Sequence, residues 1–265
     1  MSERESFASR MGFMLSAAGC AIGLGNVWRF PFIVGEYGGA LFVLIYLAFL
    51  VLLGLPLLTM ELAVGRASRS SLAWSFEKLE VKGSRWHFNK YWMIAGNYVL
   101  MSFYTVVTGW MLLYCVRGFS GEFTGDLAAA DTGAAFGAML ADPVEMFIYM
   151  MTVTVLGFLI CSGGLRGGVE RVIKPVMALL LLLLIFLAGH SVVLPGFKEG
   201  LSFYLYPSLE HLNAHPLSEV LSAAMAQAFF TLSIGVGAIQ IFGSYTGNGY
   251  RLSSEALPIT LLDTL

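Results

Sequence analysis

Residues 19–31 combine the residue types that could bind small ions inside a membrane. This stretch, GCAIGLGNVWRFP, places three glycines, an asparagine and an arginine within one apolar segment. Glycine has the most backbone freedom to lose, so three glycines within seven residues favour an opened helix. Backbone carbonyls at such an opening can face a cation, and helix ends can face an anion. The alternative is an intact transmembrane helix that is kinked or packs closely against a neighbour.

Residues 227–237 likewise place glycines and polar side chains within another apolar segment. Two hydroxyls, Thr231 and Ser233, are followed by two glycines, and Gln227 lies one turn before Thr231. Taken alone, the hydroxyls could hydrogen-bond back to their own helix. Two Gly-interrupted spans in corresponding positions of two repeats are instead typical of a transporter site at the middle of the bilayer.

Two further polar residues lie inside apolar segments. Glu61 follows a long apolar run, and an intramembrane carboxylate is a functional hypothesis by default. Its alternative role is that of a helix-end residue that reaches the headgroups or pairs with Arg66. Tyr104 lies in the middle of a span, where its hydroxyl needs a partner, either a neighbouring helix or a ligand.

Composition indicates a polytopic membrane protein. The chain has 265 residues, 57% of them hydrophobic and 12% charged, whereas soluble domains carry about 25% charged residues. The net charge of −2 gives no reason to expect nucleic acid as a partner. The three cysteines lie in apolar segments and predict buried thiols, with no disulfide or metal framework.

Six apolar segments are long enough to cross a bilayer, which takes about 20 residues. They are residues 11–33, 39–63, 91–116, 144–162, 173–194 and 219–246, and a seventh begins near residue 257. Twelve of the 15 Lys and Arg residues lie before the first span or after the second, fourth and sixth. The positive-inside rule therefore predicts a cytoplasmic N-terminus.

Together these motifs resemble the sodium:neurotransmitter symporter family, in its bacterial amino-acid transporter form. The resemblance rests on residues 19–31, 38–40, 56–66, 164–171 and 227–237 and covers essentially the whole chain. It implies an all-α fold of two inverted five-helix repeats with discontinuous first and sixth helices.

The same resemblance predicts the domain organisation. Residues 1–265 would form a single transmembrane domain, with the first repeat over 11–194 and the start of the second over 219–265. The chain would be truncated after helix six, with only the start of helix seven.

The resemblance implies two sodium sites. The first would use the carbonyl of Ala21, the side-chain oxygen of Asn26, and the carbonyl and hydroxyl of Thr231, completed by the substrate carboxylate. The second would use the carbonyls of Gly19 and Ile22, with its remaining ligands in the eighth helix.

The resemblance also implies a substrate pocket between helices one, three and six. Its lining would be Cys20, Ala21, Leu24, Gly25, Leu100, Tyr104, Phe230, Thr231, Ser233 and Val236. Monoamine transporters of the family carry an Asp where this chain has Gly23, so the substrate is expected to bring its own carboxylate. Leu100, Phe230 and Val236 make the predicted side-chain pocket apolar.

Gate residues follow from the same resemblance. Arg29 would form the outer gate with an acidic partner in helix ten. The inner gate would contain Arg4, Phe7, Ser244 and Tyr245, with an acidic partner in helix eight.

Two supporting roles also follow. Glu61 would brace the opened sixth helix by accepting hydrogen bonds from N–H groups near Ser233. Tyr46 and Gln227, with Thr231, match part of a chloride site. Whether chloride or a carboxylate fills that place would depend on helix seven, expected beyond the end of the chain.

The expected function is sodium-coupled symport of an apolar amino acid by alternating access in the inner or plasma membrane. The alternatives are a non-transporting amino-acid sensor or regulatory protein, or an incomplete half-transporter that needs a second chain or a missing C-terminal half. An intramembrane enzyme would need a cluster of nucleophiles, acids or metal ligands, and no span carries one in the sequence. A passive channel would need a continuous polar face along several helices.

Overall fold

The structure is a computed structural model that describes residues 13, 17, 19, 22–23, 25–123, 129–209, 215–247 and 252–264. Within these residues every regular element is helical, which confirms the predicted all-α fold class. In chain order the elements are η1 (Gly25–Arg29), α2 (Phe30–Glu36), α3 (Ala40–Phe49), η2 (Leu50–Gly54), α4 (Leu55–Ser68), α5 (Leu72–Leu79), η3 (Trp86–Phe88), α6 (Asn89–Phe119), α7 (Ala129–Ala141), α8 (Pro143–Ser162), η4 (Leu165–Val169), α9 (Glu170–Ser191), α10 (Phe197–Leu205), α12 (Leu217–Thr231), α13 (Ala238–Ser244) and α14 (Leu252–Thr264).

Four helical stretches in the described part of the chain are long and apolar enough to cross a bilayer. They are Ala40–Ser68, Trp86–Phe119, Pro143–Ser162 and Gly167–Ser191, and they correspond to the second to fifth predicted spans. The first of these contains Pro56, which lies in the opening turn of α4 directly after the π-helical turn η2. Because proline lacks an N–H donor, the wider turn before it lets the helix continue.

The first and sixth predicted spans are interrupted, as their glycines predicted. Ile22 and Gly23 form a bend before η1, and α12 and α13 are separated by the non-helical residues 232–237. Three residues in that segment have positive φ angles: Ser233 (52°), Gly235 (92°) and Gly237 (76°). Glycine adopts this conformation at little cost, which explains why two of the three positions are glycines.

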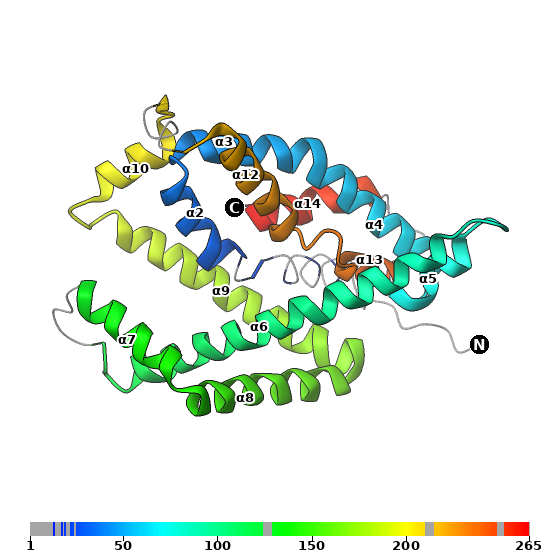
Figure 1. The fold of residues 1–265 in the computed structure, drawn as a ribbon, viewed down its shortest axis with the longest axis horizontal. Coiled ribbons are helices and arrows are strands. Elements are labelled where there is room, and N and C mark those ends of the chain that lie inside the picture. Colours follow the sequence, from blue (N-terminus) through cyan, green and yellow to red (C-terminus); the bar gives the residue numbers. More distant parts are fainter. Residues whose placement is uncertain are drawn as a thin grey trace.

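The elements from both ends of the chain pack together into what we call the central bundle: η1, α2, α3, η2, α4, α12, α13 and α14 (Figure 1). One apolar cluster joins α2 and α3 to α12. A second joins α4 to α13 and α14, and it includes Leu62, Ile239 and Ile259, all fully buried. A Cβ atom on Gly65 of α4 would overlap the Gln240 carbonyl oxygen of α13, so this crossing requires a glycine.

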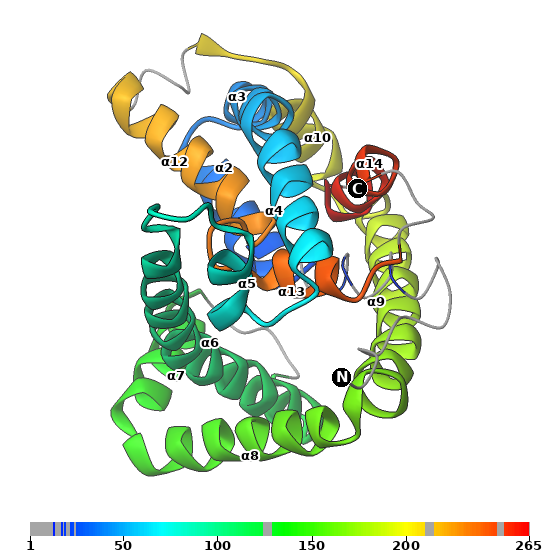
Figure 2. The ribbon, with the colours of Figure 1, turned by 90° about the vertical axis from the view of Figure 1, so that its right-hand side faces the viewer.

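The remaining long helices, α6, α8 and α9, form what we call the outer arm, together with the short turn η4 between α8 and α9. In Figure 2 these helices make an arc around the central bundle. The most apolar 18-residue windows of α8 and α9 contain no buried residue. An apolar helix can face lipid at no cost, because lipid tails are as apolar as its own side chains.

The short helix α5 connects these two regions, since it packs against both α4 and α6. It also contacts the sixth span just after its interruption. The side chain of Leu72 occupies the space beside Gly237, where a Cβ would overlap it. The hydroxyl of Ser75 accepts a hydrogen bond from Gln240 Nε2, and both of these side chains are buried.

Candidate functional site

The side chain of Asp263, near the end of α14, lies between the two interrupted spans. From η1, Asn26 Nδ2 donates to the Asp263 carbonyl oxygen at 2.7 Å and to its carboxylate at 2.8 Å. From the end of α12, Thr231 Oγ1 donates to the same carboxylate at 3.0 and 3.2 Å. Only 5% of Asp263 and 1% of Thr231 are exposed, so the carboxylate is held away from bulk water.

Tyr46 of α3 borders the same carboxylate. Its hydroxyl contacts the side chains of Thr231 and Thr264, and it lies close enough to Asp263 to interact with its charge. Four elements of the central bundle therefore meet at Asp263: η1, α3, α12 and α14.

Asp263 was missed in the sequence analysis, which expected the deciding part of helix seven to lie beyond the chain. That expectation is wrong, because α14 reaches Asp263 and places a carboxylate beside Tyr46 and Thr231. A signal was present: Asp263 is an acidic residue in the apolar run LPITLLDTL, the same signal that identified Glu61.

Gln227 makes two hydrogen bonds to residues of the first span. Its Oε1 accepts a hydrogen bond from Arg29 at 2.6 Å, and its Nε2 donates to the Gly25 carbonyl oxygen at 3.1 Å. The Arg29 guanidinium also lies 5.1 Å from the centre of the Phe230 ring, in cation–π geometry. The fully buried Gln227 thus links the first span to the sixth one turn before Thr231.

Several of the predicted pocket residues lie together around Phe230. A Cβ on Gly25 would lie 2.9 Å from the Phe230 ring, so glycine is needed for this close approach. The rings of Tyr104 and Phe230 are 6.2 Å apart. Leu100 is half-buried on α6, one turn before Tyr104.

Other predicted residues lie outside the described part of the chain. These are Cys20, Ala21 and Leu24 of the pocket and sodium site, and Arg4 and Phe7 of the inner gate.

Glu61 of α4 contacts the interrupted part of the sixth span. Its Oε1 accepts a hydrogen bond from the Gly235 N–H at 2.6 Å. Its other oxygen is buried with no hydrogen-bond partner in the structure. A charged acceptor here satisfies an N–H group that the interruption leaves outside the helical pattern.

The remaining predicted positions are distributed along the two broken spans. Gly19 packs against Ile173 and Met177 of α9, and Ile22 lies in the bend that opens the first span. Ser244 is buried at the end of α13, where its hydroxyl donates to the Ile241 carbonyl oxygen. Tyr245 follows it directly as the C-cap of that helix.

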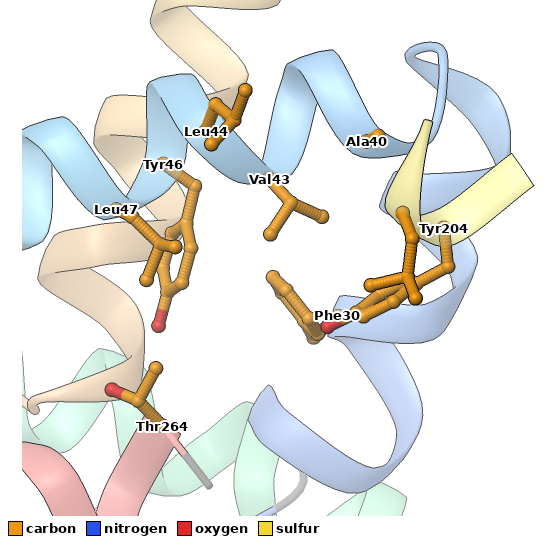
Figure 3. Close-up of a pocket in the computed structure, with 9 residues that line it drawn as sticks. Phe30, Ala40, Val43, Leu44, Tyr46, Leu47, Tyr204 and Thr264 are labelled. Atoms are coloured by element: carbon orange, nitrogen blue, oxygen red, sulfur yellow. The ribbon is translucent and has the colours of Figure 1, made fainter. Parts of the chain in front are cut away.

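A cavity of about 310 Å³ lies beside the Asp263 site, between α2, α3, α10 and α14 (Figure 3). Its lining is mostly apolar and includes Phe30, Val43 and Tyr204. The hydroxyl of Tyr46 points toward Thr264 at the edge of this cavity. None of the predicted substrate-pocket residues that the structure describes lines this cavity.

The Asp263 site offers oxygen atoms of the kind that bind hard cations. Its groups are a carboxylate, a hydroxyl and an amide, whose oxygen and nitrogen can exchange places by rotation. Among the described residues there is no group of three or more His, Cys, Asp or Glu side chains suited to a transition metal. A single carboxylate with neutral oxygens suits a cation of low charge.

Comparison with known proteins gives a consistent result. The model of the family described as "Sodium:neurotransmitter symporter family" matches residues 4–132 and 134–265. The uncharacterized sodium-dependent transporter YhdH of Bacillus subtilis is 36% identical over 267 residues, which cover 100% of this chain and 58% of YhdH. The uncharacterized sodium-dependent transporter MJ1319 of Methanocaldococcus jannaschii is 32% identical, over 98% of this chain and 53% of that protein.

A solved structure also resembles this chain over most of its length. The crystal structure of MhsT in complex with L-phenylalanine superposes with a TM-score of 0.89 at 39% identity. The match covers 98% of this chain and 58% of MhsT. The chain thus spans a little over half the length of each of these three relatives.

Proposed function

Because this chain belongs to the sodium:neurotransmitter symporter family, we propose that it forms the ion- and substrate-binding part of a sodium-coupled symporter for apolar amino acids. The family consists of transporters, and bacterial and archaeal relatives are named as sodium-dependent. The observation that carries the proposal is the carboxylate of Asp263, held between Asn26 and Thr231 of the two interrupted spans.

Sodium would bind where these three side chains meet. Asn26 and Thr231 now donate hydrogen bonds to the carboxylate. Rotation of the amide and of the hydroxyl would present their oxygens to a cation instead, while Asp263 supplies the negative charge. The ion would therefore join the first, sixth and seventh helices, and its binding would stabilise one arrangement of the bundle.

Asp263 also gives a reason to expect transport that does not require chloride. Tyr46 and Thr231, matched to a chloride site, already contact or border a carboxylate. A second anion beside this buried charge would be repelled, because a nearby like charge disfavours the charged form of both groups. The protein would thus carry its own anion in this place.

The substrate is proposed to be an amino acid with an apolar side chain. Gly23 offers no anion, so the substrate would bring its own carboxylate. Leu100, Phe230 and Val236 provide apolar side chains for the pocket. In addition, MhsT, whose structure superposes closely, was crystallised with L-phenylalanine.

Transport would proceed by alternating access, with the N-terminus in the cytoplasm of a cell whose inner or plasma membrane holds the protein. The charge distribution of the loops supports this orientation. Arg29, together with Gln227 and Phe230, would close the outer side of the pocket.

Sodium-dependent binding of radiolabelled L-amino acids in nanodiscs tests this function. The protein used should be the longest available sequence that contains this chain. We expect binding of an apolar amino acid only with sodium, and loss of binding in Asn26→Ala and Thr231→Ala. Binding that is indifferent to sodium and to both substitutions would contradict the proposal and favour an amino-acid sensor. Sodium-dependent binding without flux in proteoliposomes would contradict the transport step alone.

A further inference from the structure

A side chain of the outer arm holds the backbone of the predicted pocket wall. Asn97 of α6 places its Nδ2 atom 2.5 Å from the Val236 carbonyl oxygen and 2.7 Å from the Met93 carbonyl oxygen. An amide NH2 group has two hydrogens, so Asn97 can donate to both oxygens at once. One bond stays within α6, and the other crosses to the interrupted sixth span.

The segment that Asn97 contacts needs support from outside. Residues 232–237 alternate between positive and ordinary φ angles, so they form no repeating helical hydrogen-bond pattern. Two side chains from different helices hold neighbouring residues of this segment. Glu61 accepts from the Gly235 N–H, and Asn97 donates to the Val236 carbonyl oxygen.

Asn97 lies on the face of α6 that borders the pocket. Residues 97, 100 and 104 are separated by three and four positions, which places them on one side of a helix. Tyr104 on this face lies beside Phe230, before the interruption, and Asn97 contacts Val236, near its end. The same face of α6 therefore borders the sixth span at both ends of its non-helical part.

We propose that Asn97 is a positioning residue that sets the size of the side chain the site accepts. This inference rests on the proposed function. Asn97 acts through Val236: the carbonyl that it holds and the Val236 side chain are attached to one residue, so moving the first moves the second. Without the bond, the carbonyl is left unpaired in apolar surroundings and the segment relaxes away from α6. The pocket then enlarges, and large substrates gain relative to small ones.

The test compares sodium-dependent binding of L-alanine and L-phenylalanine in the longest available sequence that contains this chain. Asn97→Leu keeps a similar volume but removes the donor, and Asn97→Gln keeps the amide. Thr105→Val is the matched control, because Thr105 donates to the Met101 carbonyl oxygen within α6. From the typical strength of hydrogen bonds between membrane helices, we expect Asn97→Leu to shift the ratio of the two affinities by about 3- to 18-fold toward phenylalanine.

A merely structural role for Asn97 would weaken both ligands in parallel and leave their ratio unchanged, which would overturn the proposal. We expect Asn97→Gln to restore most of the original ratio and Thr105→Val to leave it as it is. In a Val236→Ala background, Asn97→Leu should shift the ratio by less than it does alone. Additive effects of the two substitutions would mean that Asn97 does not act through Val236.

Two further outcomes separate this inference from the proposed function. If the unaltered protein binds no amino acid with sodium, both fall. If it binds and the ratio is insensitive to Asn97, only the inference falls. Should Asn97→Leu fail to fold, Asn97→Ala replaces it. An alanine has no side-chain donor for the Val236 carbonyl oxygen, so an unchanged ratio in this variant would also overturn the inference.

Discussion

The central bundle and the helices α8 and α9 of the outer arm are both apolar, but they differ in how much of their apolar surface is buried inside the protein. In the span Ala40–Ser68, 28% of the most apolar window is buried, whereas in α8 and α9 none of it is. Lipid can cover an apolar helix as well as protein can, so hydropathy alone does not bring helices together. What brings the bundle together is close packing at small residues and the polar groups of the interrupted spans.

The polar contacts between helices mark the functional part of the central bundle. Asp263, Gln227 and Thr231 are nearly or fully buried, and each contacts another element of the central bundle. In the outer arm, the hydroxyls of Thr152 and Thr154 on α8 donate to carbonyls of their own helix. These three buried groups therefore join helices, whereas the two hydroxyls on α8 are satisfied within their own helix.

The largest expected effect comes from neutralising the carboxylate of the bundle. Asp263→Asn removes the charge opposite Asn26 and Thr231. Loss of one partner from a buried charge interaction costs about 3–5 kcal/mol, so sodium-dependent binding should fall at least about 100-fold. If the carboxylate occupies an anion site, added chloride should restore part of the binding.

The matched control is Asp142→Asn at the start of α8. Asp142 accepts hydrogen bonds from the N–H groups of Val144 and Glu145, and asparagine is an equally good N-cap. Binding should stay unchanged in this variant. If Asp263→Asn shows the same sodium-dependent binding without chloride as the unaltered protein, the carboxylate has no part in binding.

Truncating a leucine compares the two regions by stability. Leu62 of α4 is fully buried, whereas Leu182 of α9 is 65% exposed. Leu62→Ala should lower the free energy of unfolding by about 2–5 kcal/mol, because it leaves a cavity. Leu182→Ala faces lipid and should change it by less than about 0.5 kcal/mol. Denaturant titration in mixed micelles measures both; equal losses would remove the distinction between the regions.

Adding a methyl group, where the leucine variants remove side-chain atoms, also compares the stability of the two regions. Gly65→Ala forces α4 away from α13 and should destabilise the fold by about 1–3 kcal/mol. Gly157 of α8 has no atom within 4 Å of an added Cβ, so Gly157→Ala should be neutral or stabilise by up to about 1 kcal/mol. Thermal unfolding followed by fluorescence would distinguish them, and a tolerated alanine at residue 65 would contradict the tight crossing.

The smallest expected effect concerns the support of the interrupted sixth span. Glu61→Gln keeps an acceptor for the Gly235 N–H but removes its charge. Hydrogen bonds to charged groups exceed neutral ones by about 1 kcal/mol, so substrate affinity should fall about fivefold. Glu145→Gln, which breaks the ion pair with Arg117 in the outer arm, should leave affinity unchanged. An equal loss in both variants would mean that Glu61 acts through general stability.

The sequence alone determined the features that depend on local chemistry. Hydropathy predicted the apolar spans, and glycine clusters predicted the interruptions, because helix propensity and bilayer length act on neighbouring residues. The identity of Asn26, Thr231 and Glu61 as polar residues inside the membrane was equally visible.

The packing of the helices determines which of these polar groups contact one another. Asn26 and Asp263 are 237 positions apart, and Asn97 and Val236 are 139 apart, so no local pattern pairs them. Gln227 bonds to Arg29 and to the Gly25 carbonyl oxygen, and neither partner follows from its position in the sixth span. The physical reason is that a hydrogen bond depends on atoms being within about 3 Å with suitable angles, and that geometry is set by helix packing.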